Sequence, residues 1–183
     1  LRSFDKGMPE EVNRLVVDRL ADFHFAPTPL QVEHLKKEGI VDTVHLAGNL
    51  ISDIVQENIP KALEKSNKRE ELGLEPQKYF LSTVHRPAGV DSKENFQNIL
   101  NGLGKVSDEY KLPVIYPIHP RSRKNLDKYS LTVPSGIKLI EPLNYFDFLA
   151  LAKEAKLILS DSGGIQEEAA ILGVPLVTLR ENT

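Results

Sequence analysis

The sequence predicts an α/β fold in which helices cover both faces of a parallel sheet. After Gly48, short apolar runs alternate regularly with helix-length amphipathic segments, and several of the runs are apolar throughout. Strands of a parallel sheet are buried on both faces, so uninterrupted apolar runs are typical of them. The polar residues with the richest chemistry directly follow these runs. Because ligands bind such sheets at the carboxyl ends of their strands, this edge is the predicted site.

Each predicted strand is a short apolar run bounded by turn residues. The runs are 43–47, 79–84, 113–118, 137–140, 157–159 and 175–179. Helices are predicted where apolar residues recur at spacings of three and four, with Pro9 and Pro29 in first turns and Gly39 and Gly173 after last turns. They cover 9–23, 28–38, 92–106, 145–155 and 165–172.

The composition excludes several classes of function. The 23 Lys and Arg residues against 26 Asp and Glu give a net charge of -3, so the chain has no overall basic field for nucleic acid. The absence of cysteine excludes disulfides and thiolate zinc sites and fits a cytoplasmic location. No apolar run has the length of a membrane span. His24, His34 and His45 have no partners at metal-ligand spacing, so no metal site is predicted.

The most informative segment follows the predicted strand 157–159. It contains Ser162, Gly163 and Gly164 directly before a helix, with Glu168 further along that helix. Free backbone amides, a hydroxyl and the helix dipole then face one point, which suits a diphosphate. The Glu168 carboxylate could instead accept hydrogen bonds from the two hydroxyl groups of a ribose. The alternatives are an ordinary strand-to-helix turn for the glycines and a solvated helix carboxylate for Glu168.

Basic side chains follow two further predicted strands. His85 and Arg86 come after 79–84, and His119 and Arg121 come after 113–118. An imidazole at this edge can donate to phosphate or act as an acid. A lone histidine after a strand is more often a bystander, but the repeated arrangement favours an anionic ligand. Glu10, in a first helical turn, has an ordinary explanation in the helix dipole.

Taken in order along the chain, these motifs resemble a known family. They are Pro9-Glu10-Glu11-Val12-Asn13-Arg14, Ala47-Gly48-Asn49, His85-Arg86, His119-Pro120-Arg121 and Asp161-Ser162-Gly163-Gly164-Ile165-Gln166-Glu167-Glu168-Ala169. This set resembles the non-hydrolysing UDP-N-acetylglucosamine 2-epimerases. The resemblance implies two Rossmann-like domains of the nucleotide-sugar glycosyltransferase B type. Residues 1–48 would be the C-terminal part of the N-terminal domain, and residues 49–183 an incomplete UDP-binding C-terminal domain.

The resemblance also implies a reaction and a set of residues. The family interconverts UDP-GlcNAc and UDP-ManNAc by eliminating UDP to 2-acetamidoglucal and adding it back, which serves polysaccharide biosynthesis and uses no cofactor. Glu10 and His85 match catalytic positions. The substrate-binding positions are His119, Leu143, Phe148, Ser162, Gly163, Gly164 and Glu168. Leu143 and Phe148 would frame the uracil, and the partners implied are UDP-N-acetylglucosamine, UDP and a second copy of the chain.

Some features depart from the family pattern. The segment after His85-Arg86 differs from the usual Arg-Glu-Asn, so no role is assigned to Arg86. Family members are about twice as long as this chain. The chain opens on Leu1, and both of its ends are interpreted as cuts. This segment alone is therefore expected to be inactive. The alternatives are a UDP-sugar glycosyltransferase of the same fold and a non-catalytic UDP-binding remnant.

Overall fold

The computed structural model describes residues 4, 7 and 9–180. These residues divide into two compact units, the first ending at Asp53 and the second beginning at Ile54. Helix α3 (Leu50–Lys65) runs across this division. The assignment of 1–48 and 49–183 to the two Rossmann-like domains of the family stays a prediction.

The first unit contains a small parallel pair of strands with two helices. Its elements are α1 (Pro9–Leu20), β1 (His24–Ala26), α2 (Pro29–Lys37) and β2 (Val44–Leu46). Strand β1 is not among the strands predicted from the sequence. The buried His24 ring is fully engaged, because Nε2 donates to the Asp18 carbonyl at 2.8 Å and Nδ1 lies 2.8 Å from the Thr43 hydroxyl. These contacts explain its burial without a metal.

The two ends of α2 differ in how they are capped. Thr28 occupies the N-cap position, but its hydroxyl contacts the side chain of Gln31 and makes no bond to the helix backbone. At the other end, Gly39 adopts a φ of 79°, a left-handed conformation that glycine reaches without strain. The predicted stop at Gly39 is therefore confirmed.

The second unit is built on a fully parallel sheet. Within residues 54–180 this sheet has five strands in the order β5-β4-β3-β6-β7. The strands are β3 (Phe80–Thr83), β4 (Val114–Pro117), β5 (Ile137–Ile140), β6 (Leu157–Ser160) and β7 (Leu176–Thr178). All of them coincide with predicted runs, and the predicted parallel α/β architecture is confirmed.

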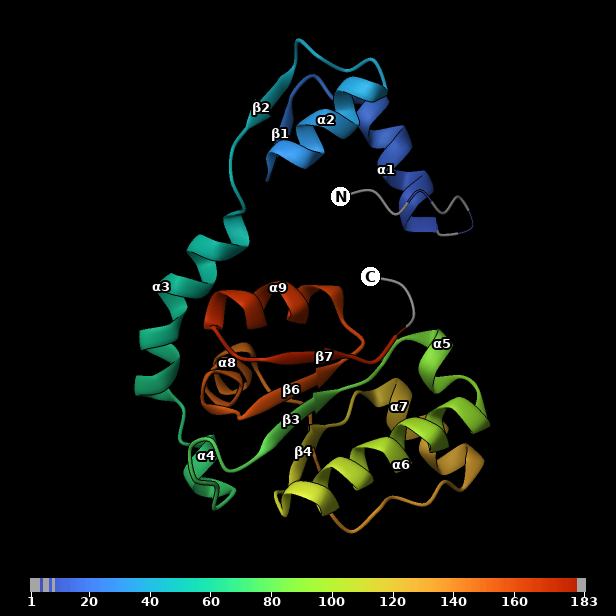
Figure 1. Cartoon of the computed structure of the whole chain (residues 1–183), viewed down its shortest axis with the longest axis vertical. Coiled ribbons are helices and arrows are strands. Elements are labelled where there is room, and N and C mark those ends of the chain that lie inside the picture. Colours follow the sequence, from blue (N-terminus) through green and yellow to red (C-terminus); the bar gives the residue numbers. More distant parts are fainter. Residues whose placement is uncertain (1–3, 5–6, 8, 181–183) are drawn as a thin grey trace. The chain divides into compact units, whose positions relative to one another are not determined.

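Helices cover both faces of this sheet. The helices that follow α3 along the chain are α4 (Lys68–Glu71), α5 (Pro87–Val90), α6 (Lys93–Tyr110), α7 (Pro120–Tyr129), α8 (Tyr145–Glu154) and α9 (Gly163–Leu172). Figure 1 shows α6 and α7 on one face and α8 and α9 on the other. From β3 the chain adds β4 and β5 on one side, and it then returns to add β6 and β7 on the other side of β3. Because each connection is right-handed, the helices before and after this return lie on opposite faces of the sheet. The reversal lies between β3 and β6.

The core between α6 and the sheet explains why this helix is predictable. Phe96, Leu100 and Leu103 are at most 2% exposed and share one helix face. Ser92 caps the helix by accepting the Asn95 amide. The apolar periodicity and the capping serine of the sequence thus agree with the packing of this helix against the sheet.

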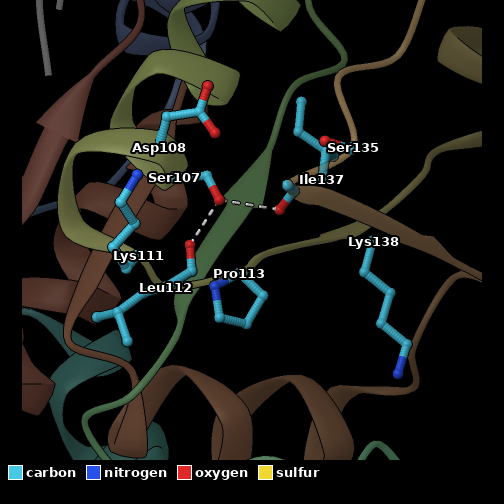
Figure 2. A pocket seen from close by; sticks show the side chains of 9 residues that line it. Ser107, Asp108, Lys111, Leu112, Pro113, Ser135, Ile137 and Lys138 are labelled. Atoms are coloured by element: carbon cyan, nitrogen blue, oxygen red, sulfur yellow. Dashed lines mark hydrogen bonds between the residues drawn. The ribbon is translucent and has the colours of Figure 1, made fainter.

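The sheet's amino edge is tightly packed around Ser107. Its hydroxyl donates to the carbonyl oxygens of Leu112 at 2.7 Å and Gly136 at 3.3 Å, beside an open groove of about 600 Å³ (Figure 2). A Cβ added to Gly136 would lie 2.2 Å from the Ser107 oxygen. This edge is opposite the predicted site.

Candidate functional site

The backbone at the end of β3 is fixed by buried hydroxyl groups. Tyr116 and Ser122 both donate to the carbonyl oxygen of Val84, at 2.6 and 2.7 Å. Burial raises the pKa of Tyr116, so its hydroxyl remains a donor. His85 and Arg86 therefore leave the sheet from an anchored position.

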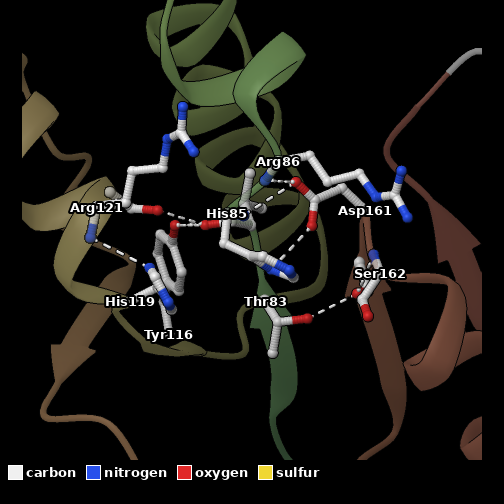
Figure 3. Close-up of polar contacts among 11 residues, drawn as sticks. Thr83, His85, Arg86, Tyr116, His119, Arg121, Asp161 and Ser162 are labelled. Carbon is white, nitrogen blue, oxygen red and sulfur yellow. Dashed lines mark hydrogen bonds and ion pairs between the residues drawn. The ribbon is translucent and has the colours of Figure 1, made fainter. Parts of the chain in front are cut away.

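The carboxylate of Asp161 joins this segment to the end of β6. Its Oδ2 accepts the backbone amides of His85 at 2.9 Å and Arg86 at 2.7 Å, and its Oδ1 lies 3.4 Å from Nδ1 of His85 (Figure 3). Asp161 is 1% exposed. The two strand ends that flank the chain reversal are thus held together by one buried side chain.

Helix α9 begins at Gly163, two residues earlier than predicted. Ser162 is the N-cap residue, and its side chain makes no capping bond. The Ser162 amide donates to the hydroxyl of Ser160, which also bonds the hydroxyl of Thr83 at 2.6 Å. Both glycines consequently lie in the first helical turn, where backbone amides have no partner within the helix. This turn has the geometry expected of an anion-binding helix terminus.

Arg86 and Arg180 converge on this helix terminus. A Cβ placed on Gly163 would lie 3.5 Å from Nη2 of Arg180 and 4.0 Å from Nη2 of Arg86. Burial and the Arg86 charge lower the pKa of Arg180, and the Asp161 carboxylate opposes them. The buried Nε of Arg180 has no hydrogen-bond partner among the described residues. Like charges gathered at a helix N-terminus suit a multiply charged anion.

No role is predicted from the sequence for either Arg86 or Arg180. Arg180 follows β7 and Arg86 follows β3, so both obey the rule that site residues come after strands. Their position after a strand was the available signal. Their convergence depends on the paths of two backbone segments that the sequence does not reveal.

Glu168 lies in the following turns of α9. Burial raises the pKa of its carboxyl, and Oε2 is a buried oxygen without a hydrogen-bond partner in the described part of the chain. Burial and the charge of Glu168 together raise the pKa of Tyr145 in the first turn of α8. Leu143 precedes α8 and Phe148 belongs to it, and both are half-buried. Their uracil-framing role stays a prediction.

His119 is exposed at the start of α7 and lies beside His85. The two rings have centroids 5.6 Å apart. Nδ1 of His119 accepts the backbone amide of Arg121 at 3.1 Å, which leaves Nε2 as the protonated nitrogen of the neutral ring. The structure thus brings His85, His119 and the α9 terminus to one edge of the sheet.

Glu10 belongs to the first unit. It lies exposed in the first turn of α1, while its neighbour Glu11 is 1% exposed and accepts Arg14 Nη1 at 3.2 Å. Its catalytic role stays a prediction.

Among residues 4, 7 and 9–180, no group of three or more His, Cys, Asp or Glu could hold a metal ion. In the same residues, no helix has both the length and the apolar character needed to cross a bilayer.

Comparisons with known proteins agree with this geometry. A family model described as UDP-N-acetylglucosamine 2-epimerase matches residues 1–183. A UDP-N-acetylglucosamine 2-epimerase of Methanococcus maripaludis is 44% identical over 191 residues, covering 100% of this chain and 52% of the relative.

Solved structures give the same result. The Methanocaldococcus jannaschii UDP-GlcNAc 2-epimerase in complex with UDP-GlcNAc and UDP has a TM-score of 0.90 at 43% identity, and the match covers 100% of this chain and 52% of that one. The Neisseria meningitidis UDP-GlcNAc 2-epimerase bound to UDP-GlcNAc has a TM-score of 0.87 at 32% identity, again covering 100% and 52%. The chain spans about half the length of these relatives.

Proposed function

Because this chain belongs to the UDP-N-acetylglucosamine 2-epimerase family, we propose that the complete protein interconverts UDP-GlcNAc and UDP-ManNAc, and that the second unit binds the UDP moiety. The Methanocaldococcus jannaschii relative is in complex with UDP-GlcNAc and UDP, and the Neisseria meningitidis relative is bound to UDP-GlcNAc, which supports this choice of ligand.

The convergence of Arg86 and Arg180 on Gly163 is the observation that carries this proposal. The guanidinium groups approach the first turn of α9 so closely that a Cβ on Gly163 would be in van der Waals contact with both of them. A diphosphate at this point would receive backbone amides, the helix dipole and guanidinium donors. Glu168, further along the helix, offers a free acceptor for the ribose hydroxyls.

The same arrangement serves the proposed elimination. When the bond from the sugar C1 to the diphosphate oxygen breaks, negative charge develops on the departing UDP. The α9 terminus and the arginines would stabilise that charge in place, without rearrangement. The base and acid must act on opposite faces of C2, and we propose Glu10 as one of these groups and His85 as the group on the diphosphate side.

Deuterium exchange tests the reaction directly. The complete protein is incubated with UDP-GlcNAc in deuterated water, and the expected products are UDP-GlcNAc and UDP-ManNAc with deuterium at C2. Transfer of the sugar to an acceptor without deuterium at C2 would indicate a glycosyltransferase instead. Binding of UDP with neither reaction would indicate a non-catalytic UDP-binding protein.

Other properties of the complete protein remain proposals. Homodimerisation rests on the family resemblance, and a cytoplasmic location rests on the absence of cysteine from the chain.

A further inference from the structure

Asp161 is a buried carboxylate to which the proposed reaction gives no direct part. It is 1% exposed and directly follows β6. Burial of a charge is costly unless the charge is paired and hydrogen-bonded, so each oxygen of this carboxylate needs a donor.

The two oxygens of Asp161 differ in how they are satisfied. Oδ2 accepts the backbone amides of His85 and Arg86. Oδ1 is buried and receives no hydrogen bond from the described residues, although Nδ1 of His85 lies 3.4 Å away. A small rotation of the imidazole would complete that bond, and it requires the proton to be on Nδ1.

We propose that Asp161 is a positioning residue that holds the neutral His85 ring in the Nδ1–H tautomer and directs Nε2 toward the ligand. The inference rests on the proposed function. The His85 side chain is 41% exposed, so the ring edge remote from the buried carboxylate faces the open rim. A carboxylate that accepts one ring N–H fixes both the tautomer and the orientation of an imidazole. Nε2 is then the nitrogen that exchanges a hydrogen bond or proton with the substrate.

His119 provides a contrast within the same site. Its Nδ1 accepts the Arg121 amide, so its neutral ring carries the proton on Nε2. The adjacent histidines are thus assigned opposite tautomers, which makes His119 an internal control.

NMR spectroscopy reads these tautomers directly. Long-range proton–nitrogen spectra of the ¹⁵N-histidine-labelled chain are recorded at alkaline pH, where the rings are neutral, and His85→Gln assigns the signals. We expect a protonated Nδ1 for His85 and a protonated Nε2 for His119. In Asp161→Asn the amide can keep the backbone contacts while its NH₂ group faces Nδ1, so His85 should change to the Nε2–H tautomer and His119 should not.

Two NMR outcomes would overturn the proposal. One is an Nε2–H tautomer of His85 in the unmodified chain, a measurement that needs no variant to fold. The other is a folded Asp161→Asn chain in which the His85 tautomer is unchanged.

Kinetics of the complete protein supply the second readout. Asp161→Asn is expected to lower kcat for epimerisation by about 100-fold or more, as misdirected tautomers do in other enzymes, with KM for UDP-GlcNAc changed by less than about threefold. Asp91→Asn is the matched control, because Asp91 binds Arg121 and Asn125 on the same rim without touching His85. It should leave the tautomer and kcat nearly unchanged.

Equal losses of kcat in the two variants, or full turnover by Asp161→Asn, would overturn the positioning role. If the complete protein incorporates no deuterium at C2, the proposed function fails, and the NMR result still decides the role of Asp161.

Discussion

The carboxyl group of Glu168 is held in a way that favours its protonated form. Burial raises its pKa, so the folded chain binds the proton more tightly than the unfolded chain does. The stability that this carboxyl contributes is therefore fully present below its unfolded-state pKa, and it is lost as the pH rises through the raised pKa of the folded chain.

Glu168→Gln should separate stability from binding. At neutral pH the free chain is expected to melt about 1–3 °C higher, because a buried charge without a partner is removed. This gain should vanish at acidic pH. UDP should bind at least about 10-fold more weakly, since a charged acceptor for the ribose is lost. Thermal melts over a pH series and calorimetric titration check both effects.

Glu75→Gln is the control, because Glu75 is exposed in a loop. It should change neither the melting temperature nor the UDP affinity. Equal melting temperatures for Glu168→Gln and the unmodified chain at neutral pH would contradict the conclusion that Glu168 carries a buried charge without a partner.

Arg180→Gln tests the proposed diphosphate contact. The variant is expected to bind UDP about 10- to 100-fold more weakly, because a hydrogen-bonded charge pair is removed. The free chain should not lose stability, since burial and Arg86 already disfavour the Arg180 charge. Calorimetry at low and high salt should also show a weaker salt dependence of UDP affinity.

Arg123→Gln removes the same charge from a side chain that is 41% exposed and lies 3.7 Å from Glu141. It should bind UDP normally. A loss of affinity equal to that of Arg180→Gln would indicate a general charge effect instead of a specific contact.

Helix α6 contains a matched pair of glycines with opposite surroundings. A Cβ on Gly104 would lie 2.6 Å from Cβ of Pro134, whereas a Cβ on Gly102 would meet no atom within 4 Å. Gly104→Ala is expected to lower the free energy of unfolding by about 1–3 kcal/mol through overpacking. Gly102→Ala should raise it by up to about 1 kcal/mol through helix propensity. Urea unfolding of both variants checks the signs, and equal effects would contradict the packing.

The elements that the sequence predicts best are those whose own residues determine them. The α6 region has apolar residues at helical spacing and a capping serine, and the strands of the second unit are apolar runs between turns. These signals come from residues that are close together in the sequence, so they can be recognised without knowledge of the fold.

Helix α7 was not predicted because its support comes from distant residues. It has few apolar side chains, and Arg121, Asn125 and Tyr129 all donate to Asp91. These partners lie 30 or more positions away in the sequence. The site follows the same rule: the glycine turn and His85 stand out in the sequence, whereas the approach of Arg86 and Arg180 depends on the sheet order.

The net charge of the whole chain does not describe the surroundings of the α9 N-terminus. The net charge is -3, yet the guanidinium groups of Arg86 and Arg180 both approach Gly163 in the first turn of that helix. A ligand anion is therefore attracted by local groups and backbone dipoles, which act over a few ångströms and require no basic chain.

UDP should accordingly stabilise this chain against heat. At about 100 times its dissociation constant, a ligand that binds the folded state adds about 2.7 kcal/mol to the free energy of unfolding. Uridine at the same concentration should raise the melting temperature much less, because it lacks the diphosphate. Equal shifts with UDP and uridine in thermal melts would contradict a diphosphate-binding helix terminus.

The bonds from Asp161 to His85 and Arg86 join residues 76 and 75 positions apart. During synthesis, His85 and Arg86 leave the ribosome well before Asp161, Gly163 and Arg180 do. At the roughly 5–20 residues per second of translation, the nascent chain spends several seconds without the Asp161 carboxylate that accepts the backbone amides of His85 and Arg86. Nucleotide cannot assist the early folding of this unit, and the ligand can act only after the last strands of the sheet have been made.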